Sequence, residues 1–280
     1  MRAILLGGDK RLIFACDCLQ QSGVVALAYP QFELNDLCRD GEVGDTVIVL
    51  PVPVSRDGVR LNMDTSNYAP INLIDLFARF EGCKAVFGGG FPNEIKWYCE
   101  KHSINCIDFF DIESFQIENA FISAEGAIHY AQSRFNRSLL DASVAIFGFG
   151  RLGKMLEHIL RSYGADVRVI ARRDSDPLRS ALTKTRLIKV ENSRELDEYE
   201  NDRAFDIVFN TVPARIISEK FILKYAIDSL IIDLASHPFG IDGEIVKKHS
   251  LNYHIESGIP GRFAPKSSGG AIARTLLSYI

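Results

Sequence analysis

Three glycines in the second half of the chain have the spacing of a turn that binds the pyrophosphate of a dinucleotide. The apolar segment 144–147 leads directly into this turn, and a segment of helical character follows it. The first glycine of such a turn makes a tight bend, the second lets the backbone approach the phosphates, and the third lets helix and strand pack closely. The first amides of the helix then donate to the phosphates. The expected cofactor contacts are Gly148, Phe149, Gly150, Arg151, Leu152 and Gly153. A turn that only packs the helix against the strand is the alternative.

Two arginines follow the next expected strand, 166–171, at the place where such proteins select between NAD and NADP. An NAD site has an acidic residue about 20 residues after the glycines, which holds the ribose hydroxyls. This chain has Arg172 and Arg173 there, and guanidinium groups bind a 2′-phosphate through paired, charge-assisted hydrogen bonds. The pattern therefore predicts NADP, with both arginines as contacts. A solvated turn is the alternative explanation of the same residues.

Two more strands of the second half end in loops with polar residues. One such loop follows the strand 206–209, and the other follows the strand 230–233 and contains Ser236 and His237. Open α/β sheets bind their ligands at the carboxyl ends of the strands. The expected cofactor contacts from these loops are Asn210, Thr211, Val212, Pro213 and Asp233. A third rigid loop, 258–266, precedes the last helix. Each loop alone is also compatible with an ordinary turn, because Pro and Gly punctuate turns.

Short apolar segments alternate with helical segments along the whole chain, and this alternation must position the loops. Nearly continuous apolar strands between helices predict a parallel sheet covered on both faces. We predict an α/β fold of two doubly wound parallel-sheet domains, the second a Rossmann NADP-binding domain, with a C-terminal helix that packs back on the first. The expected boundaries are 1–120 for a flavodoxin-like substrate and catalytic domain, 121–140 for a bridging helix, 141–262 for the Rossmann domain and 263–280 for the C-terminal helix.

A glycine triplet, Gly88–Gly90, follows the expected strand 85–87 in the first domain. It lacks the Gly-Lys-Ser/Thr continuation of a phosphate-binding loop. Because glycine is conformationally permissive, we expect a flexible turn here that closes against substrate.

The composition excludes several classes of protein. The 280 residues are 47% hydrophobic and 24% charged, which is typical of a globular protein and not of a disordered or fibrous one. No window approaches 18 consecutive apolar residues, so no membrane span is expected. The net charge of −4 argues against a nucleic-acid groove. Residues 1–120 carry a charge of −7 and residues 121–280 a charge of +3, which favours the second part for a phosphorylated ligand.

The cysteines and histidines give no sign of a metal site. All six cysteines lie before residue 107, and Cys16 and Cys18 are too close for paired structural zinc ligands. We expect the cysteines to be small apolar residues in a reducing cytoplasm. The histidines and carboxylates show no metal-ligand spacing, so we expect no metal. The first residues lack the long apolar stretch of a signal peptide.

Several short motifs, taken together in this order, resemble a known family. The most specific are Leu-Ala-Ser-His-Pro-Phe-Gly at 234–240 and Gly-Ile-Pro-Gly-Arg-Phe-Ala-Pro-Lys at 258–266, whereas many dehydrogenases share the glycine turn at 148–153. The other motifs are Gly7-Gly8-Asp9 with Arg11, Ala124-Glu125-Gly126, Asn210-Thr211 with Pro213, and Asp233. On these motifs, which run through nearly the whole chain, the sequence is similar to the A subunit of dipicolinate synthase of spore-forming bacteria.

The resemblance implies an NADP-dependent oxidation that completes the synthesis of dipicolinate, which is pyridine-2,6-dicarboxylate. The substrate would be 4-hydroxy-tetrahydrodipicolinate, an intermediate of the lysine pathway, or the dihydrodipicolinate formed by its dehydration. The resemblance also implies that the partner is a flavoprotein-like B subunit, and that the location is the cytoplasm of the mother cell during sporulation. A homo-oligomer is compatible with it, and nucleic-acid and membrane partners are not expected.

A dicarboxylate substrate needs cationic or amide donors. The expected substrate contacts are Arg11, Arg56, Ser123, Ser236 and Arg262, and the expected catalytic residues are Glu125, His237 and Lys266. Glu125 would accept the ring proton if burial raises its pKa toward neutrality. A glutamate on the surface of a helix is an equally good interpretation. Members of the family commonly carry arginine at His237, so the property that carries over is a positive charge.

Two other functions fit the same residues. One is a different two-domain NADP-dependent dehydrogenase, of the shikimate or hydroxyacid type. The other is a regulatory module that binds NADP without chemistry. A chain that is inactive alone and needs its partner is a third possibility.

Overall fold

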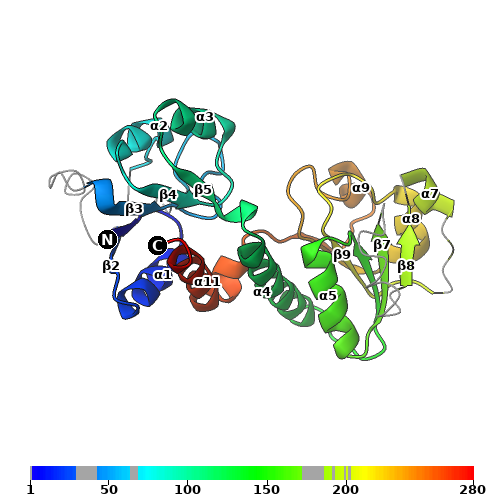
Figure 1. The fold of residues 1–280 in the computed structure, drawn as a ribbon. Helices are drawn as coiled ribbons and strands as arrows, with labels where there is room; N and C mark the ends of the chain where they lie inside the picture. Colours follow the sequence, from blue (N-terminus) through cyan, green and yellow to red (C-terminus); the bar gives the residue numbers. More distant parts are fainter. Residues whose placement is uncertain are drawn as a thin grey trace. The chain divides into compact units, whose positions relative to one another are not determined.

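The computed structural model describes residues 2–29, 43–63, 69–171, 186–190, 193–198, 200 and 203–280. The chain divides into two compact units, and each unit has its own parallel sheet. Unit 1 contains Met1–Asn119 and Pro260–Ile280, and unit 2 contains Ala120–Ile259. The two parallel sheets with their alternating helices confirm the predicted α/β fold with two domains (Figure 1).

The sheet of unit 1 has five parallel strands in the order β2-β1-β3-β4-β5. Their bounds are Arg2–Leu5 for β1, Val25–Ala28 for β2, Thr46–Val49 for β3, Ala85–Gly88 for β4 and Cys106–Asp108 for β5. Ile4 of β1 lies between Leu27 of β2 and Ile48 of β3. This order is that of flavodoxin-like sheets, and it reverses between β1 and β3, where such sheets bind their ligands.

Helices cover both faces of this sheet because successive strand residues point to opposite sides. Ala3 and Leu5 face a core shared with α1 and α11, and Ile4 and Leu6 face a core shared with α2 and α3. The bounds are Lys10–Gln21 for α1, Leu73–Phe77 for α2, Asn93–Lys101 for α3 and Pro265–Leu277 for α11, with 3-10 turns at Val43–Asp45, Ala78–Phe80 and Phe109–Asp111. The C-terminal helix therefore packs on the first unit, as predicted (Figure 1).

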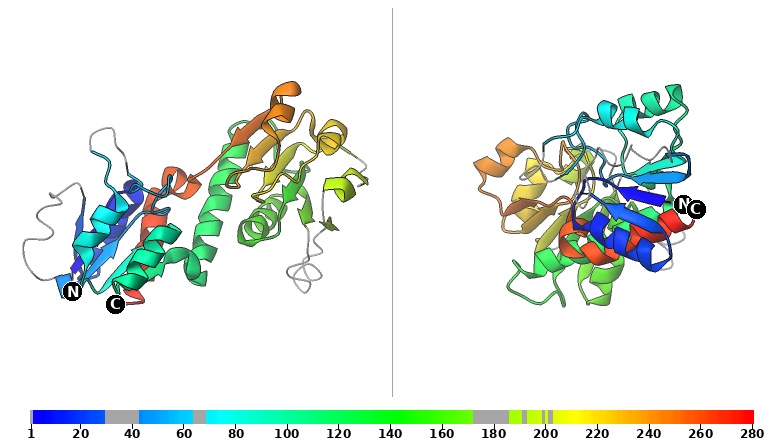
Figure 2. Two further views of the ribbon diagram at one scale, coloured as in Figure 1. Left: turned by 90° about the horizontal axis from the view of Figure 1, so that it is seen from above. Right: turned by 90° about the vertical axis from the view of Figure 1, so that its left-hand side faces the viewer.

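The two ends of the chain both belong to unit 1. The segment Pro260–Ile280 supplies α11, which lies beside α1, and Ala273 and Leu276 of α11 are fully buried in the core. Figure 2 shows the N- and C-terminal ends on this unit in two further views. The core of unit 1 is thus completed by a segment that follows unit 2 in the sequence.

The sheet of unit 2 has six parallel strands in the order β11-β10-β9-β6-β7-β8. Their bounds are Ser143–Phe147 for β6, Asp166–Ala171 for β7, Arg186–Lys189 for β8, Ile207–Asn210 for β9, Leu230–Asp233 for β10 and Tyr253–Ile255 for β11. Read from β8, this is the 3-2-1-4-5-6 order of a dinucleotide-binding sheet. The order reverses between β6 and β9, so the loops after these two strands lie at the expected ligand position.

Two cores cover the faces of the second sheet. Val144 and Ile146 pack with residues of α4 and α5, and Ala145 and Phe147 face the side on which Phe221 lies. The helices are α4 (Glu113–Gln132), α5 (Arg151–Ser162), α7 (Ser193–Glu198), α8 (Glu219–Phe221) with a π-helical turn at Ile222–Ala226, and α9 (Gly243–Lys248). Helix α10 (Ile259–Phe263) begins at the last residue of unit 2 and otherwise belongs to unit 1. Helix α4 begins in unit 1 and ends in unit 2. None of the helices in the described ranges is long and apolar enough to cross a membrane.

Candidate functional site

The glycine turn after β6 connects the strand to α5, as its sequence predicts. Gly148 has a φ of +101°, a conformation that glycine adopts without strain, and its amide donates to the Ile170 carbonyl at 2.8 Å. A side chain at Gly148 would collide with Thr211, and one at Gly153 would collide with the Gly148 carbonyl. The fold itself therefore requires the first and the third glycine.

The second glycine of the turn is different. Gly150 precedes α5 with a φ of −77°, which any residue can adopt. A Cβ built on Gly150 has no atom of the described chain within 4 Å. Packing within the protein therefore does not explain glycine here, and the space beside it is open to a ligand. The first backbone N–H groups of α5 lack partners within the helix and carry its positive dipole end, which suits an anion.

The other residues of the turn differ in their accessibility. Phe149 is buried, and the Lys154 ammonium lies 5.4 Å from the centre of its ring. Leu152 is half-buried and Arg151 is exposed. Among these side chains, Arg151 is the exposed cation at the start of α5.

The loop after β9 lies against the glycine turn. The Thr211 hydroxyl donates to the Phe147 carbonyl at 2.8 Å, and the Thr211 amide donates to the same oxygen at 2.9 Å. Val212 is half-buried beside Gly148, and Pro213 is exposed. Thr211, Val212 and Pro213 therefore lie at the switch point of the sheet, where the sequence predicted cofactor contacts.

Asn210 and Asp233 end two neighbouring strands, β9 and β10, and both side chains are fully buried. The Asn210 amide donates to Asp233 at 2.8 Å and to the Val212 carbonyl at 3.0 Å, and Asn210 accepts from the Val212 amide at 3.1 Å. These two side chains contact protein groups in this structure. Direct cofactor contact by either side chain, which the motif suggested, does not fit this burial.

The Asp233 carboxylate accepts four hydrogen bonds. Besides Asn210, the donors are the Ala235 amide at 3.1 Å, the Gly240 amide at 2.7 Å and the Tyr253 hydroxyl at 2.7 Å. Burial, the hydrogen bond to Asp233 and the charge of Asp233 together raise the pKa of the Tyr253 phenol, so Tyr253 remains the donor. We refer to Asp233, Asn210, Tyr253 and the amides of Ala235 and Gly240 as the Asp233 cluster.

Tyr253 is a residue that the motifs did not single out. It begins β11 and lies opposite Ile231 of β10, two residues before Asp233. Its contact with Asp233 depends on the register of two parallel strands, and no spacing along the sequence specifies this register. An aromatic residue with a polar end inside an expected strand was the one available sign.

The loop Ala235–Gly240 presents two exposed polar side chains, Ser236 and His237. A turn closes it, because the Phe239 amide donates to the Ser236 carbonyl at 3.1 Å. The His237 ring lies 5.6 Å from the Phe239 ring in an edge-on arrangement. This loop follows β10, so both side chains lie at the carboxyl edge of the sheet, as the sequence predicted.

Arg11 in unit 1 was an expected substrate contact, and the structure gives it other partners. Its guanidinium is buried, with hydrogen bonds to Asp9 at 2.8, 3.1 and 2.9 Å and to the Val52 carbonyl at 2.6 Å. Asp9 also caps α1 by accepting from the Arg11 amide at 3.0 Å. The interactions of Arg11 are therefore with the protein, and they join the start of α1 to the loop after β3.

The electrostatics of Asp9 agree with this pairing. Burial alone would raise the pKa of Asp9, but the hydrogen bonds to Arg11, its charge and the charge of Arg56 lower it below the ordinary aspartate value. A side chain at Gly261 would collide with the Asp9 carboxylate. The segment that leads into α11 thus lies directly against the Asp9–Arg11 pair.

Three other expected cations of unit 1 remain accessible. Arg56 lies in the loop after β3, Arg262 in α10 and Lys266 in the first turn of α11, and all three are exposed. Arg56 is close enough to Asp9 to affect its pKa, and Gly261, the neighbour of Arg262, contacts Asp9. Arg56 and Arg262 are therefore both associated with the carboxyl end of β1.

Glu125 and Ser123 lie on α4. Glu125 is exposed and Ser123 is half-buried. The neighbours Ala124, Ala127 and Ile128 form the buried side of the helix. The burial on which the general-base hypothesis for Glu125 depended is therefore absent, and Glu125 is a glutamate on the surface of the helix. Arg172 and Arg173, the expected 2′-phosphate contacts, lie outside the described residues.

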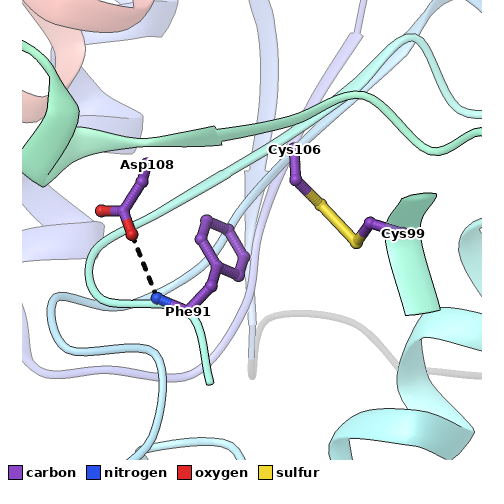
Figure 3. Close-up of a disulfide and its surroundings, with 4 residues drawn as sticks. All are labelled: Phe91, Cys99, Cys106 and Asp108. Carbon is purple, nitrogen blue, oxygen red and sulfur yellow. Dashed lines mark hydrogen bonds between the residues drawn. A yellow bond between two sulfur atoms is a disulfide. The ribbon is translucent and has the colours of Figure 1, made fainter. Parts of the chain in front are cut away.

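The glycine triplet of unit 1 is held in place by hydrogen bonds. The amides of Gly90 and Phe91 donate to the Asp108 carboxylate at 2.9 and 3.1 Å, and the Gly89 amide donates to the Pro51 carbonyl at 3.1 Å. Asp108 is buried at the end of β5 (Figure 3). These bonds join the triplet to two neighbouring strand ends, and closure of the turn against a substrate stays a prediction.

A disulfide joins Cys99 and Cys106, which corrects the expectation that the cysteines are free thiols (Figure 3). Cys99 lies near the end of α3 and Cys106 begins β5, and the short connection returns the chain so that the Cα atoms are 6.5 Å apart. This separation lies within the range of disulfides. Cys16, Cys18 and Cys83 are free. Burial raises the pKa of Cys83 to about 11, so this thiol stays protonated.

No group of three or more histidine, cysteine or acidic side chains with a metal-binding arrangement occurs in the part of the chain that the structure describes. The potential ligand-binding features in the described part include the open glycine turn and the loop with Ser236 and His237 in unit 2, and the exposed cations of unit 1.

Comparison with known proteins identifies relatives of the whole chain. Residues 2–110 match the family model for the N-terminal domain of the A subunit of dipicolinate synthase. The A subunit of dipicolinate synthase from Bacillus subtilis strain 168 is 30% identical, and the alignment covers 99% of this chain and 94% of the relative.

Solved structures show the same fold. The crystal structure of the A subunit of dipicolinate synthase from Bacillus halodurans superposes with a TM-score of 0.81 at 22% identity, covering 99% of this chain and 97% of the other. A D-lactate dehydrogenase from Salmonella superposes with a TM-score of 0.64 at 12% identity, covering 100% of this chain and 96% of the other. The two-unit architecture is thus shared with hydroxyacid dehydrogenases.

Proposed function

The chain belongs to the family of dipicolinate synthase A subunits, and from that premise we propose that it oxidises a dihydrodipicolinate to dipicolinate with NADP. The substrate would derive from 4-hydroxy-tetrahydrodipicolinate, at a branch of the lysine pathway. The relative from Bacillus subtilis is named as one of the subunits of dipicolinate synthase, which supports this reaction.

The observation that carries the proposal is the open space at Gly150. Gly148 and Gly153 are required by contacts inside the protein, whereas nothing in the described chain approaches the Cβ position of Gly150. Glycine at this position allows the phosphates of a ligand to approach the backbone closely. The turn also follows β6, next to the point where the strand order reverses. The residues present therefore fit a dinucleotide.

We infer NADP rather than NAD from charge. Arg172 and Arg173 follow β7, where NAD-binding proteins carry an acidic residue. Two guanidinium groups at this position suit a 2′-phosphate and leave the hydroxyls of an unphosphorylated ribose without their usual acceptor.

A bound nicotinamide dinucleotide would supply the acceptor for a hydride from a ring carbon of the substrate, and the proton that the ring also loses would pass to solvent water. The chain has to bind two carboxylates and orient the ring, and formation of an aromatic ring drives the oxidation. Arg56, Arg262 and Lys266 are the exposed cations that we assign to the carboxylates. We assign to Ser236 and His237 contacts with the substrate. Glu125, exposed on α4, is not assigned as the proton acceptor.

The proposal also includes a partner subunit, a cellular location and an oligomeric state. We propose that the partner is a flavoprotein-like B subunit, because the relatives are named as A subunits. We also propose a location in the cytoplasm of the mother cell during sporulation, and a homo-oligomer is compatible with this setting.

The direct test is formation of NADPH, followed by its absorbance, with purified chain, NADP and freshly generated 4-hydroxy-tetrahydrodipicolinate. The reaction is run with and without the B subunit, with NAD as a cofactor control and D-lactate as a substrate control. We expect turnover with the dicarboxylate and NADP. Turnover only with B present would assign the redox site to this chain within a complex. NADP binding without turnover under any condition would exclude the proposed reaction and favour a regulatory module, and turnover of D-lactate alone would favour a hydroxyacid dehydrogenase.

A further inference from the structure

The Asp233 cluster connects the two ends of the loop that presents Ser236 and His237. The Ala235 amide donates to one carboxylate oxygen of Asp233 and the Gly240 amide donates to the other, at 3.1 and 2.7 Å. The loop between these residues contains the exposed side chains, and its ends share one acceptor. The position of the loop therefore depends on the orientation of the Asp233 carboxylate.

Two side chains fix this orientation. Asn210 donates to the oxygen that accepts from Ala235, and the Tyr253 hydroxyl donates to the oxygen that accepts from Gly240. Each oxygen thus has one backbone donor from the loop and one side-chain donor from a neighbouring strand. No lysine or arginine in the described ranges pairs with Asp233. The charge is held by four hydrogen-bond donors, so each donor contributes strongly to the geometry.

The packing around the cluster leaves little freedom for another arrangement. Asp233 and Asn210 are fully buried, and a Cβ on Gly240 would lie 2.6 Å from the Asn210 amide nitrogen. The Glu256 amide donates to the Asp233 carbonyl at 2.8 Å, which also ties the end of β11 to β10. Tyr253 therefore belongs to a strand, β11, whose register against β10 is fixed by backbone hydrogen bonds.

We propose that Tyr253, acting through Asp233, is a positioning residue for the loop that carries Ser236 and His237. This inference rests on the proposed function, because that function gives Ser236 and His237 their contacts with the substrate. In this proposal the Tyr253 hydroxyl donates to Asp233 and has no contact of its own with the substrate. The rate of the reaction then depends on Tyr253 only through His237 and its neighbours.

Tyr253→Phe removes the hydroxyl and keeps the ring, so it tests the donor without creating a large cavity. Tyr225→Phe is the matched control, because Tyr225 lies in the same unit and its hydroxyl contacts Glu200, away from the loop. Asp233→Asn is a second variant, which keeps the shape of the side chain but removes the charge. Circular dichroism and thermal unfolding establish that each variant folds.

Amide hydrogen exchange measures the loop directly. We expect exchange at Ala235 and Gly240 to become about tenfold faster in Tyr253→Phe, since a hydrogen bond to a charged group is worth about a power of ten or more in an equilibrium constant. We expect no change at these amides in Tyr225→Phe. Unchanged exchange in both Tyr253→Phe and Asp233→Asn would overturn the proposal.

A double-mutant cycle with His237→Gln separates positioning from a general loss of stability. We expect Tyr253→Phe to lower kcat/KM by about five- to tenfold in the native chain and by less than about twofold in the His237→Gln background, because coupled residues are non-additive. The Kd of NADP should change by less than about twofold, since the contacts of the glycine turn remain. If the effects of the two substitutions on kcat/KM multiply in the double variant, Tyr253 does not act through His237, and the proposal is overturned.

The two measurements also distinguish this inference from the proposed function. A native chain that binds NADP but does not oxidise the dicarboxylate would exclude the proposed function. Hydrogen exchange would then decide the inference alone: faster exchange at Ala235 and Gly240 in Tyr253→Phe would support the positioning of the loop, and unchanged exchange would overturn it.

Discussion

The carboxylate of Asp9 and the guanidinium of Arg11 form an ion pair within the first unit, with Nε 2.8 Å from Oδ1 and Nη2 2.9 Å from Oδ2. The same guanidinium donates to the Val52 carbonyl, 41 residues away in the sequence. The pair thus joins the loops that follow β1 and β3, the two strands between which the order of the sheet reverses.

Asp9→Asn should destabilise unit 1 at neutral pH. The folded pKa of Asp9 is lowered, so its contribution to stability is present above the ordinary aspartate pKa of roughly 3.9 and is lost as the pH falls through the lower folded value. We expect a loss of about 1–3 kcal/mol at pH 7, because the variant leaves buried Arg11 without its charged partner while Asp9 itself is partly exposed.

Urea unfolding of the two proteins between pH 2 and pH 7 would measure this difference, which should close in acid. Asp111→Asn, at an exposed position of the same unit, is the control and should change little. A difference that stays constant down to pH 2 would contradict the linkage of stability to the Asp9 carboxylate.

Substitutions of two glycines in the turn after β6 should have different effects, one on the stability of the protein and the other on NADP binding. Gly153→Ala should lower the melting temperature, because its Cβ would collide with the Gly148 carbonyl. Gly150→Ala should cost at most about 1 kcal/mol through the helix cap, yet weaken NADP by about tenfold or more, since the methyl group occupies the space of the ligand. Thermal unfolding and fluorescence titration with NADPH measure the two effects. Tight NADPH binding by Gly150→Ala would contradict the location of the site.

Replacement of both Arg172 and Arg173 by alanine should change the choice of cofactor. We expect the Kd of NADP to rise by about 100-fold or more, because hydrogen bonds between charged groups contribute about 1.5–3 kcal/mol each and the variant removes both arginines. The Kd of NAD should change little. The measurement is titration of both dinucleotides at two salt concentrations. The NADP affinity of the native chain should fall more steeply with salt than the NADP affinity of the double variant. Equal weakening of NAD and NADP would contradict the assignment of these residues to the 2′-phosphate.

His237 and Glu125 should respond differently to substitution. His237→Arg should keep kcat/KM within about threefold of the native value and His237→Gln should raise KM by about tenfold, if the positive charge is what the position supplies. Glu125→Gln should retain most of the turnover, because an exposed carboxylate lacks the burial that tunes a general base. Steady-state kinetics on the three variants measures this. A loss of about a hundredfold or more in Glu125→Gln would restore Glu125 as the proton acceptor.

The disulfide between Cys99 and Cys106 should affect both the number of thiols that can be titrated and the stability of unit 1. The chain denatured without reductant should expose two fewer thiols than the chain denatured with it, because Cys99 and Cys106 are joined. Reduction should lower the stability of unit 1 by up to about 2.5 kcal/mol, the value expected for closing a loop this short. The variant Cys106→Ser is the control, since reductant should then have no further effect. Equal thiol counts with and without reductant would exclude the disulfide.

The fold and the glycine turn between β6 and α5 were predictable because their signals are local. Each strand is a short apolar segment, and the three glycines lie between a strand and a helix in the order that the turn requires. The choice of loops at the carboxyl ends of strands followed from topology alone. The buried face of α4 has a local signal of the same kind, because apolar residues such as Ala127, Ile128 and Ala131 recur at helical spacing.

The roles of the polar residues were less predictable because they depend on contacts across the sheet. Arg11 has the chemistry of a carboxylate-binding residue, and only the approach of Val52 and the orientation of Asp9 show that its donors are used internally. Asp233 similarly resembles a cofactor contact until its four donors are located. Tyr253 meets Asp233 through strand register, which the sequence does not specify.

Because α11 follows unit 2 in the sequence, it affects the order in which the two units can complete their folding during synthesis. Unit 2 is continuous in the sequence, so all of it has been synthesised before Pro260–Ile280 is made. Unit 1 has by then only the segment 1–119, and α1 still lacks the side chains of Ala273 and Leu276 that cover it. Domains usually fold as units in the order of synthesis, and here that order is inverted. Unit 2 is the first that can be complete, and the first-made unit is the last to close its core.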